Sequence, residues 1–545
     1  MSNKFTKSLQ KHNTVTENNA LAHSSTGSML ADQFSKAGNF RGRDIKEVFL
    51  DQSVLHADDP VKALRFVFYL RLITRKTKLY GTKTENVQRG QGQRDESFKR
   101  FLWYAANQPD IFYDNIWLFI PVGRYKDIFE ILWYAHKNQI MVDEARVLKE
   151  MLEYYGTDEN GDLLKKYIPL TDSSASTDRA EFMNHMARMM RNILSISDEG
   201  LRKFKVSGEA HEWQQKISQG RFGSINFKKI PGKALHNMVK SDFLANHDLE
   251  KKYLDWIKQQ PVAKFTGYPY ELMKSVEYNM PIYKKHTYDK QFQGLIDLAS
   301  EDDGAISGNV WCALDTSASM TWEESKVEDG IYAIDVCLSL GIYFSTLNTG
   351  AFHKHVVAFS NRSRVAELSG DFCDMVNQAK GLRAGGSTNF QSVINEIVRV
   401  RSRNPNVPLE DYPQTLLVIS DMQFNPTNSG SGWSNRRRNG PLRTRDTETN
   451  HEMAMRKLRE VFPSDWVDNF KVIWWDCIAR VTDNQPTHID EGGTYVFSGW
   501  DGAIISLLLG GDEEIDENGE KRQLTLEEMI DKALSQEILT YANVE

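Results

Sequence analysis

Large apolar residues recur at three- and four-residue spacing through much of the first three hundred residues. Apolar residues at this spacing share one face of an α-helix, so the pattern predicts a series of amphipathic helices. A series of short helices of this kind favours an all-α, HEAT-like helical repeat region. The predicted helices cover residues 61–75, 96–108, 114–138 with a break at Pro121 and Gly123, 142–156, 181–195 and 248–260.

The pattern changes near residue 305, where short apolar runs begin to alternate with helical segments. Central strands that are apolar on both faces, joined by helices, are typical of a doubly wound, mostly parallel α/β sheet. The predicted strands are 309–315, 353–359, 414–420, 470–476 and 493–497, and the predicted helices are 329–347, 389–402, 451–462 and 502–510.

These two patterns predict a multidomain chain with four parts. Residues 1–44 are polar and rich in Ser, Asn and Thr, so we expect a flexible leader. Residues 45–304 form the helical repeat domain and residues 305–511 form the α/β domain. Residues 512–545 form an acidic linker followed by one more amphipathic helix.

The composition is that of a soluble globular protein of 545 residues with a net charge of -7. Such a chain is no polycation, so a nucleic-acid surface would have to be a local patch. Four cysteines without a CxxC pair indicate reduced thiols in the cytoplasm rather than a zinc site, and Cys312 and Cys477 read as small core residues. The N-terminus lacks the apolar run of a secretory signal, and no segment reaches the roughly 20 apolar residues of a membrane helix. We therefore expect a cytoplasmic monomer without a membrane partner.

Oxygen-bearing side chains follow three segments of the predicted α/β domain. Asp315, Ser317 and Ser319 come directly after one strand, Thr388 lies in a Gly-Gly-Ser-Thr loop before a helix, and Asp421 ends another strand. Ligands of open α/β sheets gather beyond the carboxyl ends of the strands, so these groups can converge. Carboxylates and hydroxyls are the hard ligands that Mg²⁺ prefers. The five residues therefore predict a site for Mg²⁺ or another divalent cation, with an open position for a partner's carboxylate or phosphate.

Three basic segments are candidates for contacts with RNA phosphates. The alternative is that each segment is an ordinary solvated face or a loop that only improves solubility. The first lies between residues 71 and 100, the second near residue 230, and the third in a Gly- and Ser-rich insertion at 428–445 that follows Asp421. The candidate residues are Arg75, Lys76, Lys78, Lys83, Arg89, Arg94, Lys99, Arg100, Lys228, Lys229, Lys233, Arg436, Arg437 and Arg438.

Several motifs resemble a known family. The segments ALDTSASM, GGSTNF, LVISDMQF and VIWWDC are similar to the metal-dependent von Willebrand factor A domain of an uncharacterised family of plants, fungi, large viruses and phages. The segments 87–102, 120–132 and 225–239 resemble its helical region, which is itself similar to the Ro (TROVE-type) ribonucleoprotein. The resemblance implies a ring of helical repeats that is closed by the A domain. It also implies that the ring binds structured or misfolded RNA. It further implies that the protein is located in the host cytoplasm if the chain is viral. Ala318 replaces the usual glycine between the two serines.

Two binding functions remain open from the sequence. The first is a non-catalytic, RNA-binding ribonucleoprotein scaffold. The second is a metal-dependent protein adhesion module that captures an acidic partner, for example an adaptor for a MoxR-type AAA+ ATPase. The chain has no P-loop, so such an ATPase would be a separate protein. It also has no GxSxG or HExxH motif, so we expect no enzyme activity.

Overall fold

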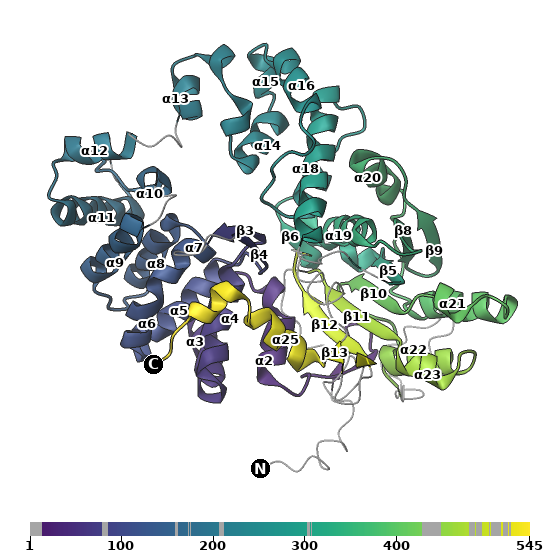
Figure 1. Cartoon of the computed structure of the whole chain (residues 1–545). Helices are drawn as coiled ribbons and strands as arrows, with labels where there is room; N and C mark the ends of the chain where they lie inside the picture. Colours follow the sequence, from purple (N-terminus) through teal and green to yellow (C-terminus); the bar gives the residue numbers. More distant parts are fainter. Residues whose placement is uncertain are drawn as a thin grey trace. The chain divides into compact units, whose positions relative to one another are not determined.

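The computed structural model divides the chain into two compact units (Figure 1). The sheet unit comprises Met1–Phe40 and Gln260–Lys532, and the helical unit comprises Arg41–Gln259 and Ala533–Glu545. The residues that the structure describes are 14–78, 85–157, 162–172, 174, 176–206, 212–301, 306, 308–427, 448–478, 485–486, 493–500, 502, 514–515, 521–522 and 525–545.

The helical unit confirms the predicted helical region. Its helices start at local signals, such as Asp44 at the N-cap of α3 and Asp59 followed by a proline in α4. The described elements are α3 (Ile45–Asp58), α4 (Pro60–Arg71), the hairpin β3 (Arg75–Lys78) and β4 (Glu85–Gln88), α5 (Asp95–Asn107), α6 (Pro109–Asn115), α7 (Phe119–Val122), α8 (Tyr125–Lys137), α9 (Glu144–Thr157), α10 (Asp162–Tyr167), α11 (Asp178–Leu194), α12 (Asp198–Val206), α13 (Glu212–Ser218), α14 (Gly232–Lys240), α15 (Phe243–Asn246), α16 (Glu250–Lys258) and η9 (Glu537–Tyr541).

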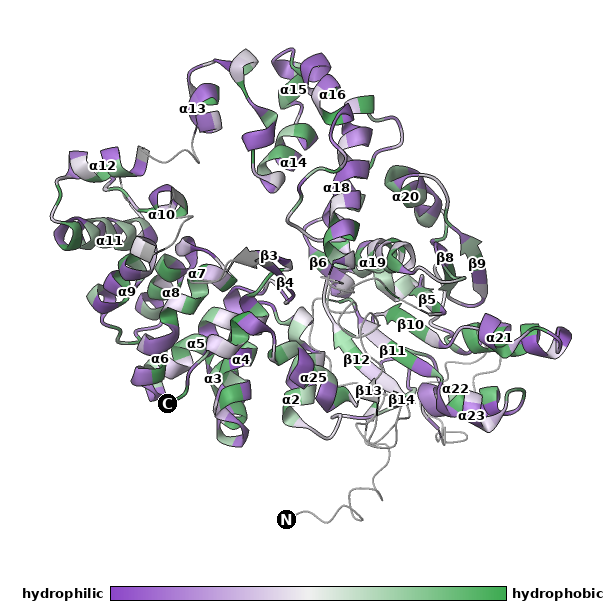
Figure 2. Cartoon of the chain, viewed as in Figure 1, coloured by the Kyte–Doolittle hydropathy of each residue, from purple (hydrophilic) through white to green (hydrophobic). Residues whose placement is uncertain are grey.

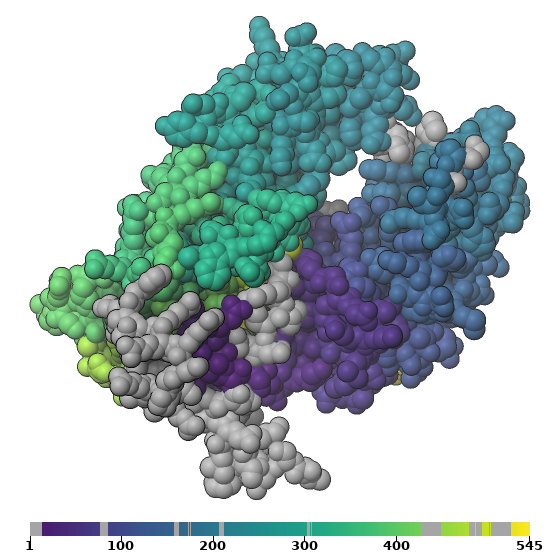
Figure 3. Space-filling model, turned by 180° about the vertical axis from the view of Figure 1, so that it is seen from behind, coloured from purple at the N-terminus to yellow at the C-terminus, as the bar shows by residue number. Residues whose placement is uncertain are grey.

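Aromatic residues form the centre of the first half of this unit. Phe68, Phe101 and Phe119 come from three different helices, and their ring centroids lie 4.8 to 5.6 Å apart. All three are fully buried. Tilted and edge-on packing of this kind adds to the stabilisation from burying apolar area. Successive helices from α3 to α9 contact one another, and their residues form a continuous purple to blue surface in Figure 3.

The sheet unit confirms the predicted mostly parallel sheet. Six strands lie in the order β12-β11-β10-β5-β8-β9, and all neighbours are parallel except β8 and β9. Burial on both faces explains their apolar sequences, and β10 is mainly green in Figure 2. The strands are β5 (Val310–Asp315), β8 (His355–Phe359), β9 (Ser363–Glu367), β10 (Thr415–Ser420), β11 (Lys471–Asp476) and β12 (Thr494–Ser498).

Helices cover this sheet and connect its strands. The helix α19 is buried along almost its whole length and contacts β5 and β10. The helices α21 and α22 contact each other and contribute to an apolar cluster that also includes Phe390 and Trp474. The described helices of the unit are α2 (Met29–Ser35), α17 (Pro269–Ser275), α18 (Ile282–Ser300), α19 (Ala333–Leu347), α20 (Phe372–Lys380), α21 (Gln391–Arg403), α22 (Asn450–Arg459) and α23 (Ser464–Asp468); α25 (Leu526–Leu534) spans the division between the units, and the predicted helix 502–510 lies outside the described residues apart from Gly502.

The prediction of a flexible leader is wrong for residues 14–40. This segment belongs to the sheet unit, where α2 and a 3₁₀ turn at Ala37–Asn39 pack against the edge strand β12. The Thr16 hydroxyl donates to the carbonyl of Phe424 at 2.8 Å, and the Gly38 amide donates to Ser498 Oγ at 3.0 Å. Covering an exposed sheet edge satisfies backbone groups that would otherwise face solvent, which gives this polar segment a structural role.

The unit boundaries also differ from the predicted domain boundaries. The helices α17 and α18, expected in the helical repeat domain, belong to the sheet unit, where both contact α19. Residues 533–545 belong to the helical unit, where Asn543 accepts a hydrogen bond from Asn115. Amphipathic periodicity identifies a helix but carries no information about the core in which its apolar face is buried.

Candidate metal centre

The predicted metal ligands follow strands at the point where the chain order of the sheet reverses. The chain runs from β5 to β8 on one side, then returns to place β10 on the other side of β5. The strands β5 and β10 are parallel and in register, with Leu314 opposite Ile419. Asp315 and Asp421 therefore leave the same edge of the sheet, at the crevice where open α/β sheets bind ligands.

The loop after β5 holds its side chains in a tight turn. The amide of Ser317 donates to Asp315 Oδ1 at 2.9 Å, and the hydroxyls of Ser317 and Ser319 lie 3.1 Å apart. Asp315 and Ser317 are buried, whereas Ser319 is half-buried. The structure thus brings the first three predicted ligands together in one cluster.

The loop that carries Thr388 is tied to the Asp315 loop by its backbone. The Gly385 amide donates to the carbonyl of Thr316, and the Ala318 amide donates to the carbonyl of Gly386, both at 2.9 Å. Gly385 and Gly386 have φ values of 69° and 96°, which residues with a Cβ rarely adopt. The glycine pair therefore permits this close approach, and Thr388 is buried beside it.

Asp421 joins the same cluster from the loop after β10. It is 2% exposed, and its Oδ1 accepts the amide of Gln423 at 3.1 Å. The amide of Asn425 in the same loop donates to the carbonyl of Thr388 at 3.0 Å, so this loop is also tied to the glycine loop. All three predicted ligand segments therefore meet.

Asp315 is the most constrained group of the cluster. It is fully buried, and burial together with the carboxylate of Asp421 raises its pKa well above the usual range. Hydrogen bonds from Ser420 Oγ, at 2.6 Å to Oδ2, and from Ser317 act in the opposite direction. Among the described residues, no group of three or more His, Cys, Asp or Glu side chains is placed to hold a metal. A cation here would therefore need the three hydroxyls as well as the two carboxylates.

The sequence analysis did not identify the residues whose side chains hydrogen-bond to the strand ends that carry this cluster. Ser420 is the last residue of β10, and its hydroxyl reaches across to Asp315. The thiol of Cys337 lies 3.5 Å from the carbonyl of Asp315, and the thiol of Cys477 lies 3.4 Å from the carbonyl of Ser420. The expectation that Cys312 and Cys477 are buried core thiols is confirmed. A serine at the end of an apolar strand was the available signal for Ser420.

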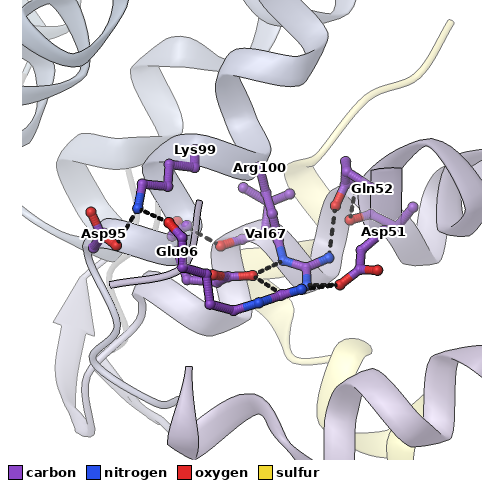
Figure 4. A network of polar contacts seen from close by, with 10 residues as sticks. Asp51, Gln52, Val67, Asp95, Glu96, Lys99 and Arg100 are labelled. Atoms are coloured by element: carbon purple, nitrogen blue, oxygen red, sulfur yellow. Dashed lines mark hydrogen bonds and ion pairs between the residues drawn. The ribbon is translucent and has the colours of Figure 1, made fainter. Parts of the chain in front are cut away.

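Four of the candidate RNA-contact residues between residues 71 and 100 are buried or are held by other groups of the protein. Arg100 is fully buried, with Glu96 at 2.9 Å and Gln52 at 3.3 Å (Figure 4). Lys99 is largely buried and pairs with Asp95 at 2.8 Å. Arg89 is buried, and Arg75 donates to backbone carbonyls. Buried charges need partners, and Lys99 and Arg100 have carboxylate partners, whereas Arg75 is bound by neutral carbonyls.

The remaining basic candidates are distributed differently. Lys76 and Arg94 are exposed in the helical unit, as are Lys228 and Lys229, whereas Lys233 is half-buried. Lys229 pairs with Glu212 at 3.0 Å. The side chain of Lys78, and the whole of Lys83, Arg436, Arg437 and Arg438, lie outside the described residues.

Comparisons with known proteins found one matching family and two curated relatives. The profile of a family described as a domain of unknown function (DUF7788) matches residues 310–543, which include the sheet and the candidate metal centre. An uncharacterized protein of Acanthamoeba polyphaga mimivirus is 23% identical over 353 residues, covering 60% of this chain and 55% of the viral protein. Protein GrpE of Thermoplasma volcanium is 30% identical over 112 residues, covering 19% of this chain and 64% of that protein.

The chain therefore spans less than two thirds of the length of both curated relatives. Among solved structures, the Ro (RSR) protein of Deinococcus radiodurans is similar, with 11% sequence identity and a TM-score of 0.44. That match covers 94% of this chain and 99% of the Deinococcus chain. Within the described part of the chain, no helix is both long enough and apolar enough to cross a membrane.

Proposed function

We propose that the sheet unit is a von Willebrand A-type binding domain that holds Mg²⁺ or another divalent cation through Asp315, Ser317, Ser319, Thr388 and Asp421. The observation that carries the proposal is the environment of Asp315. This carboxylate is fully buried, it accepts hydrogen bonds from the neutral donors Ser317 and Ser420, and the main charge acting on it is the carboxylate of Asp421.

Two adjacent buried carboxylates disfavour each other's ionised form, and burial adds to the cost. A bound divalent cation reverses this effect, because it supplies the largest local charge and favours both ionised carboxylates. Mg²⁺ takes six oxygen ligands at close to octahedral geometry, so five protein oxygens would leave one position for water or a partner. The two carboxylates and three hydroxyls therefore suit a cation that retains an open position.

The open position would accept an anionic group of a partner, either a carboxylate or a phosphate. Trp322 lies three residues after Ser319, and its side chain is 54% exposed. Exposed tryptophans beside a site are enriched in binding hot spots, so Trp322 would add apolar contact area. We therefore propose a non-catalytic role in which the cation, together with Trp322 beside it, binds an acidic partner.

Titration of the full-length protein with Mg²⁺ in a calorimeter tests this proposal. The wild type should bind one Mg²⁺ per chain, and Asp315→Ala should bind none. Asp374→Ala is the matched control, because Asp374 is a half-exposed carboxylate of the same unit that pairs with Lys285 at 3.0 Å. Equal Mg²⁺ binding by wild type and Asp315→Ala would refute the site.

RNA binding by the helical unit is the second candidate function. It is favoured by residues 213–241, which contain no acidic residue and six cations. Arg221, Lys228 and Lys240 of this segment are exposed. Lys216 and Lys229 pair with Glu212, which directly precedes the segment, and the exposed cations can attract phosphates and make binding dependent on salt. The six cations are Lys216, Arg221, Lys228, Lys229, Lys233 and Lys240.

A further inference from the structure

Three arginines of the helical unit surround a single carboxylate. Asp127, in the first turn of α8, is completely buried, and its Oδ2 accepts the Nε of Arg71 at 2.7 Å and the Nη2 of Arg71 at 2.5 Å. Its Oδ1 lies 3.4 Å from the Nε of Arg124, the residue that begins this helix. Arg75 is the third arginine, and within the described part of the chain its hydrogen bonds go to backbone carbonyls rather than to a carboxylate.

Arg75 is held in place by backbone groups, and its charge is left unneutralised. Its Nη2 donates to the carbonyl of Pro121 at 2.6 Å and to the carbonyl of Gly123 at 2.9 Å. Its Nε is enclosed and has no hydrogen-bond partner. Burial, and then the neighbouring Arg71, lower the pKa of Arg75 to about 10, with a further contribution from Arg124. A buried donor without a partner costs free energy, so the cluster favours an added acceptor.

The charges of this cluster do not balance. Arg71 and Asp127 form one buried ion pair, which leaves the guanidinium groups of Arg75 and Arg124 in excess. A fourth arginine, the exposed Arg94, follows Gln93, whose amide donates to the carbonyl of Leu70 at 2.6 Å, so Arg94 lies beside the segment that carries Arg71. The side chain of Arg124 is 30% exposed, so a ligand from solvent can reach the cluster.

The turn between α7 and α8 requires a cation beside Asp127, and Arg71 meets this requirement. It does not require Arg75 or Arg124. A Cβ at Gly123 would lie 2.1 Å from Asp127 Oδ2, so the chain passes directly over the carboxylate at the turn between α7 and α8. Arg71 alone satisfies that carboxylate as an ion pair. The side chain of Arg124 adds only a long contact, so fixing the turn does not require it.

We propose that Arg75, Arg94 and Arg124 form a binding site for a phosphate group. Guanidinium groups bind phosphate through paired hydrogen bonds, and a doubly charged anion matches the excess charge of the cluster. Tyr167 lies beside the site, with its ring centroid 5.8 Å from the Cζ of Arg124. The Nζ of Lys166 lies 5.5 Å from the same ring centroid, which adds a further cation beside the site and favours an anionic ligand. This inference does not depend on the proposed cation site.

Binding experiments with the full-length protein can test the site and identify the source of the phosphate. The probes are inorganic phosphate, adenosine 5′-monophosphate and an oligouridylate with a 5′-hydroxyl, each titrated in EDTA so that no divalent cation contributes. Arg124→Gln should weaken binding about tenfold or more, because it removes a charge-assisted hydrogen bond. Arg146→Gln is the matched control, since Arg146 is an exposed arginine of the same unit that stacks on Tyr113, with its Cζ 4.1 Å from the ring centroid. Circular dichroism establishes that each variant is folded.

The pattern across the probes decides the outcome. Binding of phosphate or the mononucleotide that is lost in Arg124→Gln and kept in Arg146→Gln supports a small phosphorylated ligand. The same pattern with the oligouridylate alone supports a nucleic-acid backbone. If Arg124→Gln is not folded, Arg94→Gln replaces it, because Arg94 is exposed. Absence of saturable binding to every probe, or equal losses in Arg124→Gln and Arg146→Gln, would overturn the proposal.

Discussion

The hydroxyl of Ser420 donates a hydrogen bond of 2.6 Å to Oδ2 of Asp315 and thereby links the ends of two adjacent parallel strands. The same hydroxyl accepts the amide of Met422 at 3.1 Å. Ser420→Ala should therefore lower the free energy of unfolding by about 1–3 kcal/mol, because a buried carboxylate and a buried amide lose a partner. Urea denaturation in EDTA measures this change.

The control for this substitution is Ser339→Ala. Ser339 is equally buried, but its hydroxyl donates only to the carbonyl of Val336 within the same helix. Alanine is a good helix former, so this control should cost less. Equal losses in the two variants would mean that the Ser420–Asp315 bond contributes nothing specific.

Asp315→Asn should separate the stability of the metal-free protein from its response to Mg²⁺. Removing one of two adjacent buried charges relieves repulsion with Asp421, so stability in EDTA should be unchanged or higher. The wild type should gain about 2.7 kcal/mol when free Mg²⁺ is a hundred times the dissociation constant, and the variant should gain almost nothing. Thermal melts with EDTA and with Mg²⁺ measure both effects, and an equal gain in the variant would contradict the proposed ligand.

Gly386→Ala should damage both the fold and the candidate metal centre. Gly386 has a φ of 96°, and a Cβ there would lie 2.7 Å from the side-chain Nδ2 of Asn361. The expected loss is about 1–3 kcal/mol, with weaker Mg²⁺ binding because the carbonyl of Gly386 accepts the amide of Ala318. Gly308→Ala is the control: its φ is 86° but a Cβ would meet open space, so it should lose stability without losing affinity for Mg²⁺.

Two features of the sequence made it possible to predict the parallel sheet and the clustering of the candidate metal ligands. Strands buried on both faces are apolar throughout, and side chains at the ends of parallel strands share one edge of the sheet. The edge strand β9 was missed because it is polar and largely solvent-facing, as its sequence Ser363–Glu367 shows. Its position at the edge of the sheet leaves it largely unburied, so its sequence contains no apolar run to detect.

Ion pairing was only partly predictable from the sequence, because Glu96 and Asp95 lie four residues before Arg100 and Lys99, whereas Asp51 is distant along the chain. A count of cations between residues 71 and 100 suggested a surface, yet Arg100 is enclosed by Glu96, Gln52 and Asp51 (Figure 4). Asp51 lies in a different helix, and its distance along the chain hides the contact. Charge patterns identify an exposed face only when the partners of each charge are known.

RNA binding, if the helical unit performs it, should depend on the segment 213–241. The double variant Arg221→Gln, Lys228→Gln removes two exposed cations and should reduce the salt dependence of RNA affinity by up to about two phosphate contacts. Fluorescence anisotropy at several salt concentrations measures the slope. Lys203→Gln is the control, because Lys203 is an exposed cation of the same unit that pairs with Glu199 at 2.7 Å. An unchanged slope in the double variant would exclude this segment as the RNA surface.

Arg100→Leu distinguishes a structural role from an RNA-binding role for the buried arginine. The substitution removes the 2.9 Å ion pair with Glu96 and should destabilise the protein by about 2 kcal/mol or more, since a buried carboxylate loses a charged partner. Glu96 keeps its contact with Arg43 at 2.9 Å, which limits the loss. Adding Glu96→Gln should recover part of the stability, because the uncompensated charge is then gone. RNA affinity of the folded fraction should be unchanged in both variants, whereas a drop in affinity without loss of stability would show that Arg100 reaches the ligand after all.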